Sequence, residues 1–308
     1  MNWNFEQVHG PLGRPIGGLC WDGSGLLFSD IEASTILRWD PQAGTVSPWR
    51  RYTNRVNGIV AGPDGTVYGC QEGSRRVIAM ARDGSASATE TLLAGRVHNF
   101  PRFIAMDAHG GLWFSDRHHT VVASGPQLFP PLAHQSVLHL ARGAKPRPHW
   151  HLARMTFDTT SPSGVALSPD GRTLYVSDTN NSTRGTRELR AYPIRSDHTL
   201  GPPIVLHVFG ADHRGVHRGA EGLCVDQDGN VLACAGACES GPGPMIYVFS
   251  PAGAVLEAHP VPADYPLNCA FGGDDLSNLY VSTEDGRLLC AGATGRRGCR
   301  LPAAKAVA

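Results

Sequence analysis

A short phrase that returns six times along the chain constrains its fold more than any other feature. Each copy has a variable residue, a small residue, an apolar stretch, a turn rich in Asp and Gly, and a second apolar strand. A repeat at 40 to 61 positions is typical of repeat architectures, and it favours one domain over 1–308. The variable first residues of the six copies are Gly17, Asn57, Arg102, Ser163, Glu221 and Asn268.

Each copy predicts two strands joined by a tight turn and followed by a third strand. The fourth copy is the clearest, with strands at 165–167 and 173–177 on either side of Ser168-Pro169-Asp170-Gly171. Pro and Gly supply the fixed and positive φ values that such turns need. With an outer strand after most triplets, the sequence predicts an all-β, six-bladed β-propeller. The last copy has only three strands, so we expect the segment 3–8 to join it and close the ring.

The composition narrows the range of partners. The 308 residues carry 27 basic and 27 acidic side chains without a block of one sign, which argues against nucleic acid and membrane surfaces as partners. No apolar run is long enough to span a membrane, and the first residues lack the layout of a secretory signal. The eight cysteines show no CxxC pair, so buried free thiols and a cytoplasmic location are expected.

The repeat also predicts where a functional site would lie. The first strand of a propeller blade lines the central channel, so its preceding residue lies at the channel mouth. The loop after the second strand overlooks the same mouth, whereas the Pro-Asp-Gly turns lie on the opposite face. Candidate residues therefore include the six first residues of the copies and three residues in the overlooking loops, His118, His119 and Asp178.

Several segments resemble one known family. They are Leu26–Ile31 (LLFSDI), Thr53–Gly58 (TNRVNG), Ser168–Thr179 (SPDGRTLYVSDT) and Asn268–Asp275 (NCAFGGDD), which occur in order over nearly the whole chain. Together they resemble the SMP-30/gluconolactonase/LRE-like family. The resemblance implies a six-bladed propeller that hydrolyses a sugar lactone with one divalent metal, often calcium or zinc, in its channel.

The family's metal site is replaced here. The resemblance implies a Glu before the first inner strand, an Asn before the third, an Asn before the fourth and an Asp before the fifth. This sequence has Gly17, Arg102, Ser163 and Glu221 at those positions, so Glu221 is the only acidic residue that remains. One divalent cation held by Glu221 and Ser163, and no metal at all, both stay open. Hard cations prefer several carboxylates, and a nearby arginine disfavours them.

Glu221 and Arg102 are the candidate catalytic residues. The carboxylate of Glu221 suits a general base, and Arg102 suits binding of a substrate carboxylate or phosphate, or stabilisation of an oxyanion. A structural Glu–Arg pair that fills the channel is the alternative. Asn57, Ser163, Asn268, Asp178, His118 and His119 are candidate substrate-binding residues.

A long insertion in the third copy adds one more candidate. The segment 117–156 is rich in His, Pro and Arg, and long loops in compact domains are often lids or binding loops. Trp150 is a candidate to cover the channel mouth and shape a substrate pocket. The alternative is a solvated loop outside the site.

These residues leave three functions open. The first is a lactonase-type hydrolase that acts on a small-molecule lactone or related ester in the channel, and both neutral and anionic substrates stay open. The second is a metal-independent cyclase, isomerase or other tailoring enzyme that uses Glu221 as acid and base. The third is a binding propeller without catalysis. Sensitivity of activity to chelators separates the first two, and a Glu221→Gln variant with unchanged ligand affinity would favour the third.

Overall fold

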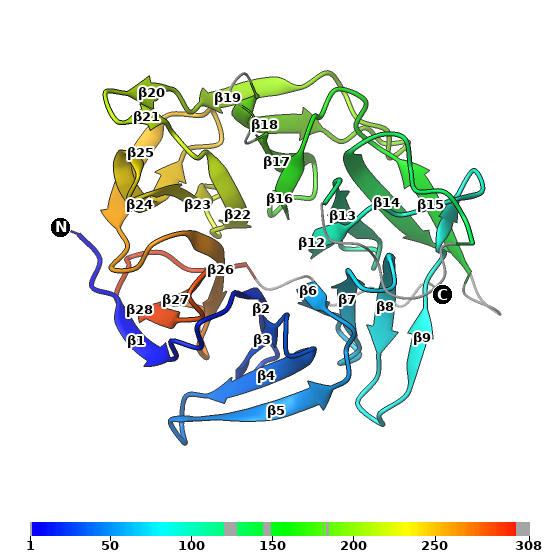
Figure 1. Ribbon diagram of the computed structural model, residues 1–308, viewed down its shortest axis with the longest axis horizontal. Helices are drawn as coiled ribbons and strands as arrows, with labels where there is room; N and C mark the ends of the chain where they lie inside the picture. Colours follow the sequence, from blue (N-terminus) through cyan, green and yellow to red (C-terminus); the bar gives the residue numbers. More distant parts are fainter. Residues whose placement is uncertain (1, 120–127, 144–148, 181, 183–184, 300–308) are drawn as a thin grey trace.

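The computed structural model consists of six four-stranded antiparallel sheets arranged around a central channel (Figure 1). It describes residues 2–119, 128–143, 149–180, 182 and 185–299. Figure 1 shows the first strand of each sheet nearest the centre and the fourth at the rim. The prediction of an all-β, six-bladed propeller is confirmed.

Each blade takes its strands in chain order, from the channel outward. Blade one contains β2 (Ile16–Trp21), β3 (Leu26–Asp30), β4 (Thr35–Asp40) and β5 (Thr45–Arg51). Blade two contains β6 (Val56–Ala61), β7 (Val67–Gln71), β8 (Arg76–Met80) and β9 (Ala86–Ala88). Blade three contains β12 (Pro101–Met106), β13 (Leu112–Asp116), β14 (Ser136–Arg142) and β15 (Trp150–Arg154).

The other three blades follow the same order, except at the end of the chain. Blade four contains β16 (Pro162–Leu167), β17 (Thr173–Thr179), β18 (Arg187–Pro193) and β19 (Ile204–Val208). Blade five contains β22 (Ala220–Val225), β23 (Val231–Ala237), β24 (Ser240–Phe249) and β25 (Val255–Pro260). Blade six contains β26 (Pro266–Gly272), β27 (Asn278–Thr283), β28 (Leu288–Ala291) and the N-terminal β1 (Glu6–His9).

The N-terminal strand closes the ring, as the sequence predicted. Strand β1 pairs antiparallel with β28, with Glu6 opposite Cys290 and Gln7 opposite Leu289. Two short hairpins lie outside the blades, β10–β11 (Leu92–Leu93 and Arg96–Val97) and β20–β21 (Ala211–Asp212 and Gly215–Val216). The described residues form no helix that is long and apolar enough to cross a membrane.

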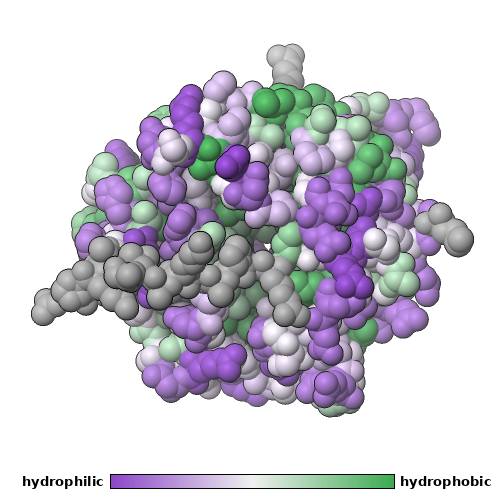
Figure 2. All heavy atoms as spheres, turned by 180° about the vertical axis from the view of Figure 1, so that it is seen from behind, coloured by the Kyte–Doolittle hydropathy of each residue, from purple (hydrophilic) through white to green (hydrophobic). Residues whose placement is uncertain are grey.

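The core lies between the blades. Apolar side chains of neighbouring sheets interleave there, such as Leu138 and Leu140 of blade three with Tyr68 of blade two. Such burial is the main favourable contribution to folding. One broad face of the molecule carries mainly hydrophilic residues, interrupted by separate apolar patches (Figure 2). All eight cysteines are free thiols.

The small residue of the repeated phrase has a packing cause. A Cβ atom on Gly164 would lie 2.2 Å from the carbonyl oxygen of Glu221, and one on Gly58 would lie 2.3 Å from that of Arg102. Neighbouring inner strands therefore approach each other too closely for a side chain at this position. Ser177 strengthens one of these contacts, because its hydroxyl accepts from the Gly164 N–H at 2.8 Å and donates to the Glu221 carbonyl at 2.7 Å.

Candidate functional site

An irregularity in every inner strand directs the ring residues. The pairing between first and second strands changes register once in each blade, at the start of the inner strand. In blade three the change lies between Pro101 and Ile104, and in blade five between Ala220 and Leu223. Bulges of this kind redirect a side chain and are common beside active sites. They account for the repeated placement of one variable residue at the channel mouth.

Glu221 lies at the centre of an arginine cluster. Its side chain is buried, and Oε2 lies 3.1 Å from Ser163 Oγ and 3.5 Å from Arg102 Nη2. Oε1 lies 3.6 Å from Arg218 Nη2 and 4.0 Å from Arg117 Nη1. The structure thus brings the two candidate catalytic residues, Glu221 and Arg102, together. It adds two arginines that the sequence analysis did not select.

The three guanidinium groups are held in different ways. Arg117 donates to Ser163 Oγ at 2.7 Å. Arg218 donates to the carbonyl oxygens of Gly236 and Pro266 and lies over the Tyr265 ring. Arg102 makes no hydrogen bond through its guanidinium to any described residue, and its Nε is buried without a partner there. Because a guanidinium carries five N–H donors, Arg102 keeps donors for a ligand oxygen.

Arg102 also forms one wall of a small pocket at the channel mouth. The pocket has a volume of about 210 Å³. Asn57, Glu72 and Asn268 line it together with Arg102 and His119. Glu221 is not among the lining residues, so the Arg102 side chain separates it from the pocket. In this arrangement Glu221 holds Arg102, Arg117 and Arg218 in position through its carboxylate.

A carboxylate from blade two, that of Glu72, does line the pocket. Glu72 is buried, with Oε1 2.7 Å from Asn57 Nδ2 and Oε2 3.4 Å from Arg55 Nη2. Sequence reasoning did not select Glu72, although it lies in a loop that overlooks the channel mouth. Its signal was the position directly after a second strand, which it shares with many polar residues. The pocket and the arginine cluster behind it contain seven charged side chains, which are Arg55, Arg102, Arg117, Arg218, Glu72, Glu221 and Glu284. Four arginines against three glutamates leave one positive charge in excess.

The two candidate histidines separate in the structure. His119 lines the pocket and stacks on Phe100, with ring centroids 4.7 Å apart. Burial lowers the pKa of His119, and the positive charge of Arg102 lowers it further against the opposing effect of Glu72. His119 is therefore neutral near neutral pH. His118 instead contacts the Gln135 side chain and the Leu132 carbonyl, outside the pocket.

Two residues that the sequence analysis selected for substrate binding, Asp178 and Trp150, do not line the pocket at the channel mouth. Asp178 is fully buried and accepts from the backbone N–H groups of Thr160 and Ser161, so it fixes the loop before the inner strand. Trp150 does not cover the channel mouth. It begins the outermost strand β15 and packs edge-on against Tyr68, with centroids 5.8 Å apart. Three strand spacings, roughly 14 Å, separate an outermost strand from the innermost one.

The remaining candidates stay at the mouth. Asn57 and Asn268 both line the pocket, while the Asn268 Oδ1 also accepts from the Cys269 N–H at 2.9 Å. Gly17 lines it as well, and a Cβ atom there would lie 2.9 Å from Asn57 Oδ1. A glutamate at position 17, as the family resemblance implies, would therefore require Asn57 to move.

The residues at the site do not fit a divalent cation. The Ser163 hydroxyl donates to Glu221 and accepts from the positively charged Arg117, so a guanidinium already occupies its oxygen. Three guanidinium groups lie within 4.0 Å of the Glu221 carboxylate and repel a cation. Among the described residues, no three His, Cys, Asp or Glu side chains gather in a way that would hold a metal ion. The metal role assigned to Glu221 and Ser163 is therefore disfavoured by local charge.

Comparison with known proteins gives consistent relatives. The chain is 26% identical over 278 residues to a gluconolactonase from Zymomonas mobilis, covering 85% of this chain and 73% of that protein. It is 33% identical over 131 residues to a 6-deoxy-6-sulfogluconolactonase from Pseudomonas putida, covering 42% and 40%. The solved structure of a gluconolactonase from Xanthomonas campestris superposes with a TM-score of 0.75 at 26% identity, covering 94% and 89%.

A family model covers most of the propeller. The model of the SMP-30/gluconolactonase/LRE-like region matches residues 17–285, from the first ring residue to the loop after β27. The match includes all six inner strands and every residue of the arginine cluster. The resemblance found in the sequence is thereby confirmed. The chain belongs to the SMP-30/gluconolactonase/LRE-like family.

Proposed function

We propose that this protein hydrolyses a small lactone in the pocket at the channel mouth. The observation that carries the proposal is Arg102, whose guanidinium lines the pocket with unused donors and is fixed from behind by Glu221. Relatives named as gluconolactonases support this reaction class. A pocket of about 210 Å³ suits a single sugar-sized ring.

Each step of hydrolysis can be assigned to a residue of this chain. Water adds to the lactone carbonyl carbon while a carboxylate accepts one of its protons. Arg102 donates to the carbonyl oxygen as it becomes negative, which is the largest stabilising effect in many acyl transfers. The ring C–O bond then breaks, and the leaving oxygen takes back the proton to give a hydroxy acid. The arginines favour this outcome because the product carries a carboxylate that the lactone lacks.

Glu72 is the carboxylate that the pocket favours as general base. Glu72 and Glu284 both line the pocket, whereas Glu221 does not. Of the two, Glu284 is exposed, and Glu72 is buried and held by Asn57. In this proposal Glu221 is a positioning residue, and its selection from sequence as the base stays an untested prediction. Asn57 holds Glu72 and, with Asn268, orients the hydroxyl groups of the substrate.

The charge of the site supports an anionic lactone as substrate. One positive charge remains in excess among the seven charged side chains at and behind the pocket. A relative over part of the chain is named for a sulfonated gluconolactone, which is an anion. We expect a phosphate or sulfonate on the substrate to lower KM relative to the neutral lactone.

Paired variants test the assignment. Acid release from gluconolactone and from phosphogluconolactone would be followed with a pH indicator for the unaltered protein, Glu72→Gln and Glu221→Gln. Asp228→Asn, an exposed substitution in a turn on the opposite face, is the control. We expect kcat to fall by about 100-fold or more in Glu72→Gln. Glu221→Gln should mainly raise KM, and Glu221→Asp should restore part of the loss.

The opposite pattern would reassign the base. Loss of kcat in Glu221→Gln with little effect of Glu72→Gln would make Glu221 the base. Lactone hydrolysis that is absent from the unaltered protein, with ligand affinity unchanged in both variants, would contradict an enzymatic role and favour a binding propeller.

A further inference from the structure

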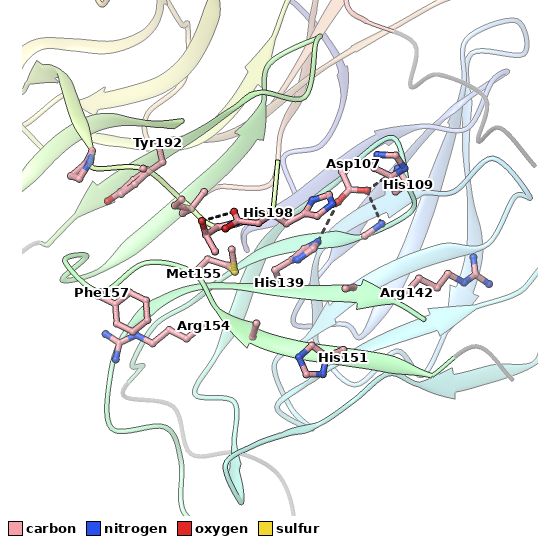
Figure 3. A pocket seen from close by; sticks show the side chains of 18 of the residues that line it. Asp107, His109, His139, Arg142, His151, Arg154, Met155, Phe157, Tyr192 and His198 are labelled. Atoms are coloured by element: carbon pink, nitrogen blue, oxygen red, sulfur yellow. Dashed lines mark hydrogen bonds and ion pairs between the residues drawn. The ribbon is translucent and has the colours of Figure 1, made fainter. Parts of the chain in front are cut away.

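A second and larger cavity lies away from the channel, between blades three and four. Its volume is about 990 Å³. One wall is formed by strands β14 and β15 of blade three, and the opposite wall by Tyr192 and the loop between β18 and β19. Figure 3 shows His139, His151 and Met155 on the blade-three side and Tyr192 and His198 across from them. None of the residues assigned to the channel-mouth site lines this cavity.

Small and polar residues at packing positions create the cavity. Across β14 and β15, His139 lies opposite Ala153 and Ala141 lies opposite His151. All four side chains line the cavity, so this part of the sheet alternates imidazoles with methyl groups. His139 pairs with Trp113 of the second strand of blade three. At the equivalent position of blade five, Val248 pairs with Leu232 of the second strand and is buried against blade six. In blade five an apolar side chain fills this volume, whereas in blade three the same volume is part of the cavity.

The histidine nearest the core is already fixed. His139 Nε2 lies 3.2 Å from Asp107 Oδ2, and the His139 ring stacks on Trp113 with centroids 4.2 Å apart. Trp113 Nε1 donates to the same carboxylate oxygen at 3.0 Å. These contacts make a rigid polar floor, and a dashed line in Figure 3 marks the one between His139 and Asp107. Within this floor the Asp107 carboxylate also accepts from the backbone N–H groups of His109 and Gly111.

Two arginines without an acidic partner lie at the two ends of the cavity. Arg142 and Arg154 both line it, and neither makes an ion pair with a described carboxylate. Arg154 lies over the Phe157 ring at 4.5 Å, and that ring is 74% exposed. Of the other acids on the wall, Asp158 pairs with Arg190 at 3.4 Å, and Asp197 accepts from the Thr199 hydroxyl in its own loop.

These features suit an elongated acid rather than a neutral apolar molecule. Methyl groups, Met155 and the exposed Phe157 ring offer apolar contacts for a flat or extended body. Burial of such a body against them is favourable in proportion to its area. Arg154 offers a charge-assisted contact at the same end as Phe157, and its planar fork matches a carboxylate.

We propose that the cavity between blades three and four is a second binding site, for an aromatic or aliphatic carboxylate whose acid group contacts Arg154. The site is independent of the proposed lactone chemistry, because it shares no residue with the pocket at the channel mouth. Its ligand lies along β15 with its apolar body against Ala141 and Ala153.

Binding of 2-naphthoate tests the site. Isothermal titration of the whole chain would be compared with titration by the neutral analogue 2-naphthalenemethanol. Loss of the acid group or substitution Arg154→Met should weaken binding by about tenfold, the value of one charge-assisted hydrogen bond. Ala153→Phe should fill the cavity and abolish binding. Arg51→Met, an exposed substitution on the outermost strand of blade one, should leave binding unchanged.

Several outcomes would overturn the proposal. They are absence of naphthoate binding by the unaltered protein, equal affinity for the neutral analogue, and binding that survives both Ala153→Phe and Arg154→Met. Arg154 lies at a strand end, so Arg154→Met keeps the test decisive if Ala153→Phe does not fold. Lactone hydrolysis in the two variants should match that of the unaltered protein, which separates failure of this site from failure of the proposed function.

Discussion

Ser163 and Glu221 meet across the boundary between blades four and five, where the serine hydroxyl donates to the glutamate Oε2 at 3.1 Å. Ser163 is fully buried and its oxygen also accepts from Arg117 at 2.7 Å. The serine therefore links a carboxylate to one of its arginines, a role that leaves it no free hydroxyl for attack on a substrate. Five expected outcomes rest on this arrangement and on the packing around it.

Substitution Ser163→Ala should lower lactone hydrolysis by no more than about 30-fold. It removes two hydrogen bonds behind Arg102 but no group that touches the substrate, and such bonds contribute about 1 kcal/mol each. The measurement is kcat/KM for the variant and the unaltered protein. A loss of about 10,000-fold would instead indicate a nucleophilic serine.

Substitution Arg102→Met should reduce kcat by about 100-fold or more, the usual effect of removing one donor to a developing oxyanion. Methionine keeps most of the side-chain length, so the pocket wall remains. Steady-state kinetics with Arg172→Met as the exposed control would show the effect. Equal activity of Arg102→Met and the control would show that Arg102 serves only as a partner of Glu221.

Removal of divalent metals should leave activity unchanged. The three guanidinium groups within 4.0 Å of Glu221 already neutralise the carboxylate that a cation would need. The test is hydrolysis before and after dialysis against a chelator, with metal content measured on both samples. Activity that disappears on dialysis and returns with one particular metal would contradict this reading of the site.

Stability should fall as the pH is lowered from 6.5 to 4 because of His98. This side chain is fully buried, both ring nitrogens lack a partner among the described residues, and burial lowers its pKa to about 4. The folded state requires neutral His98, whereas the unfolded chain binds a proton below pH 6.5. The stabilising contribution is thus complete above pH 6.5 and decreases by about 3 kcal/mol on reaching pH 4.

The variant His98→Leu isolates this effect. It keeps the volume, removes the buried nitrogens, and should make the free energy of unfolding less dependent on pH between 4 and 6.5. Urea unfolding at several pH values measures the difference. Parallel pH profiles for the variant and the unaltered protein would rule His98 out as the cause. His217, whose pKa is also lowered to about 4 by burial, contributes in the same direction.

Substitution Gly164→Ala should destabilise the propeller by more than about 2 kcal/mol, because the new methyl group would lie 2.2 Å from the Glu221 carbonyl oxygen. The matched control is Gly210→Ala, where no atom lies within 4 Å of the added carbon. Thermal unfolding should separate the two variants by several degrees. Equal melting temperatures would mean that the inner strands move apart at little cost.

The repeat made the fold and the ring residues predictable. One variable residue per copy and one register change per blade place Arg102, Ser163 and Glu221 at the same height. A repeat predicts that these residues occupy equivalent positions, because every blade packs against its neighbours in the same way. The partners of these residues were not predictable in the same way. Arg117 and Arg218 come from connecting segments of different length, where spacing along the chain does not fix direction in space.

The two misplaced residues have separate physical reasons. Asp178 is the last but one residue of its second strand, and Asp30 and Asp116 end theirs. Asp116 likewise accepts from two backbone N–H groups at 2.8 Å. The recurrence of this aspartate in three blades indicates a structural role. Trp150 lies in a segment that appeared to be an insertion, but that segment returns to the sheet as β15 and pairs with β14.

Closure of the ring by β1 has a consequence for synthesis of the chain. Glu6 pairs with Cys290, so β1 has no partner until β28 has been synthesised. Blades one to five can assemble from strands that are close in sequence while translation continues. The completed ring requires β1 to stay available throughout, and a bulky group fixed beside it would delay the final pairing. Synthesis of β28, rather than formation of any one of the first five blades, sets the earliest time at which the channel is complete.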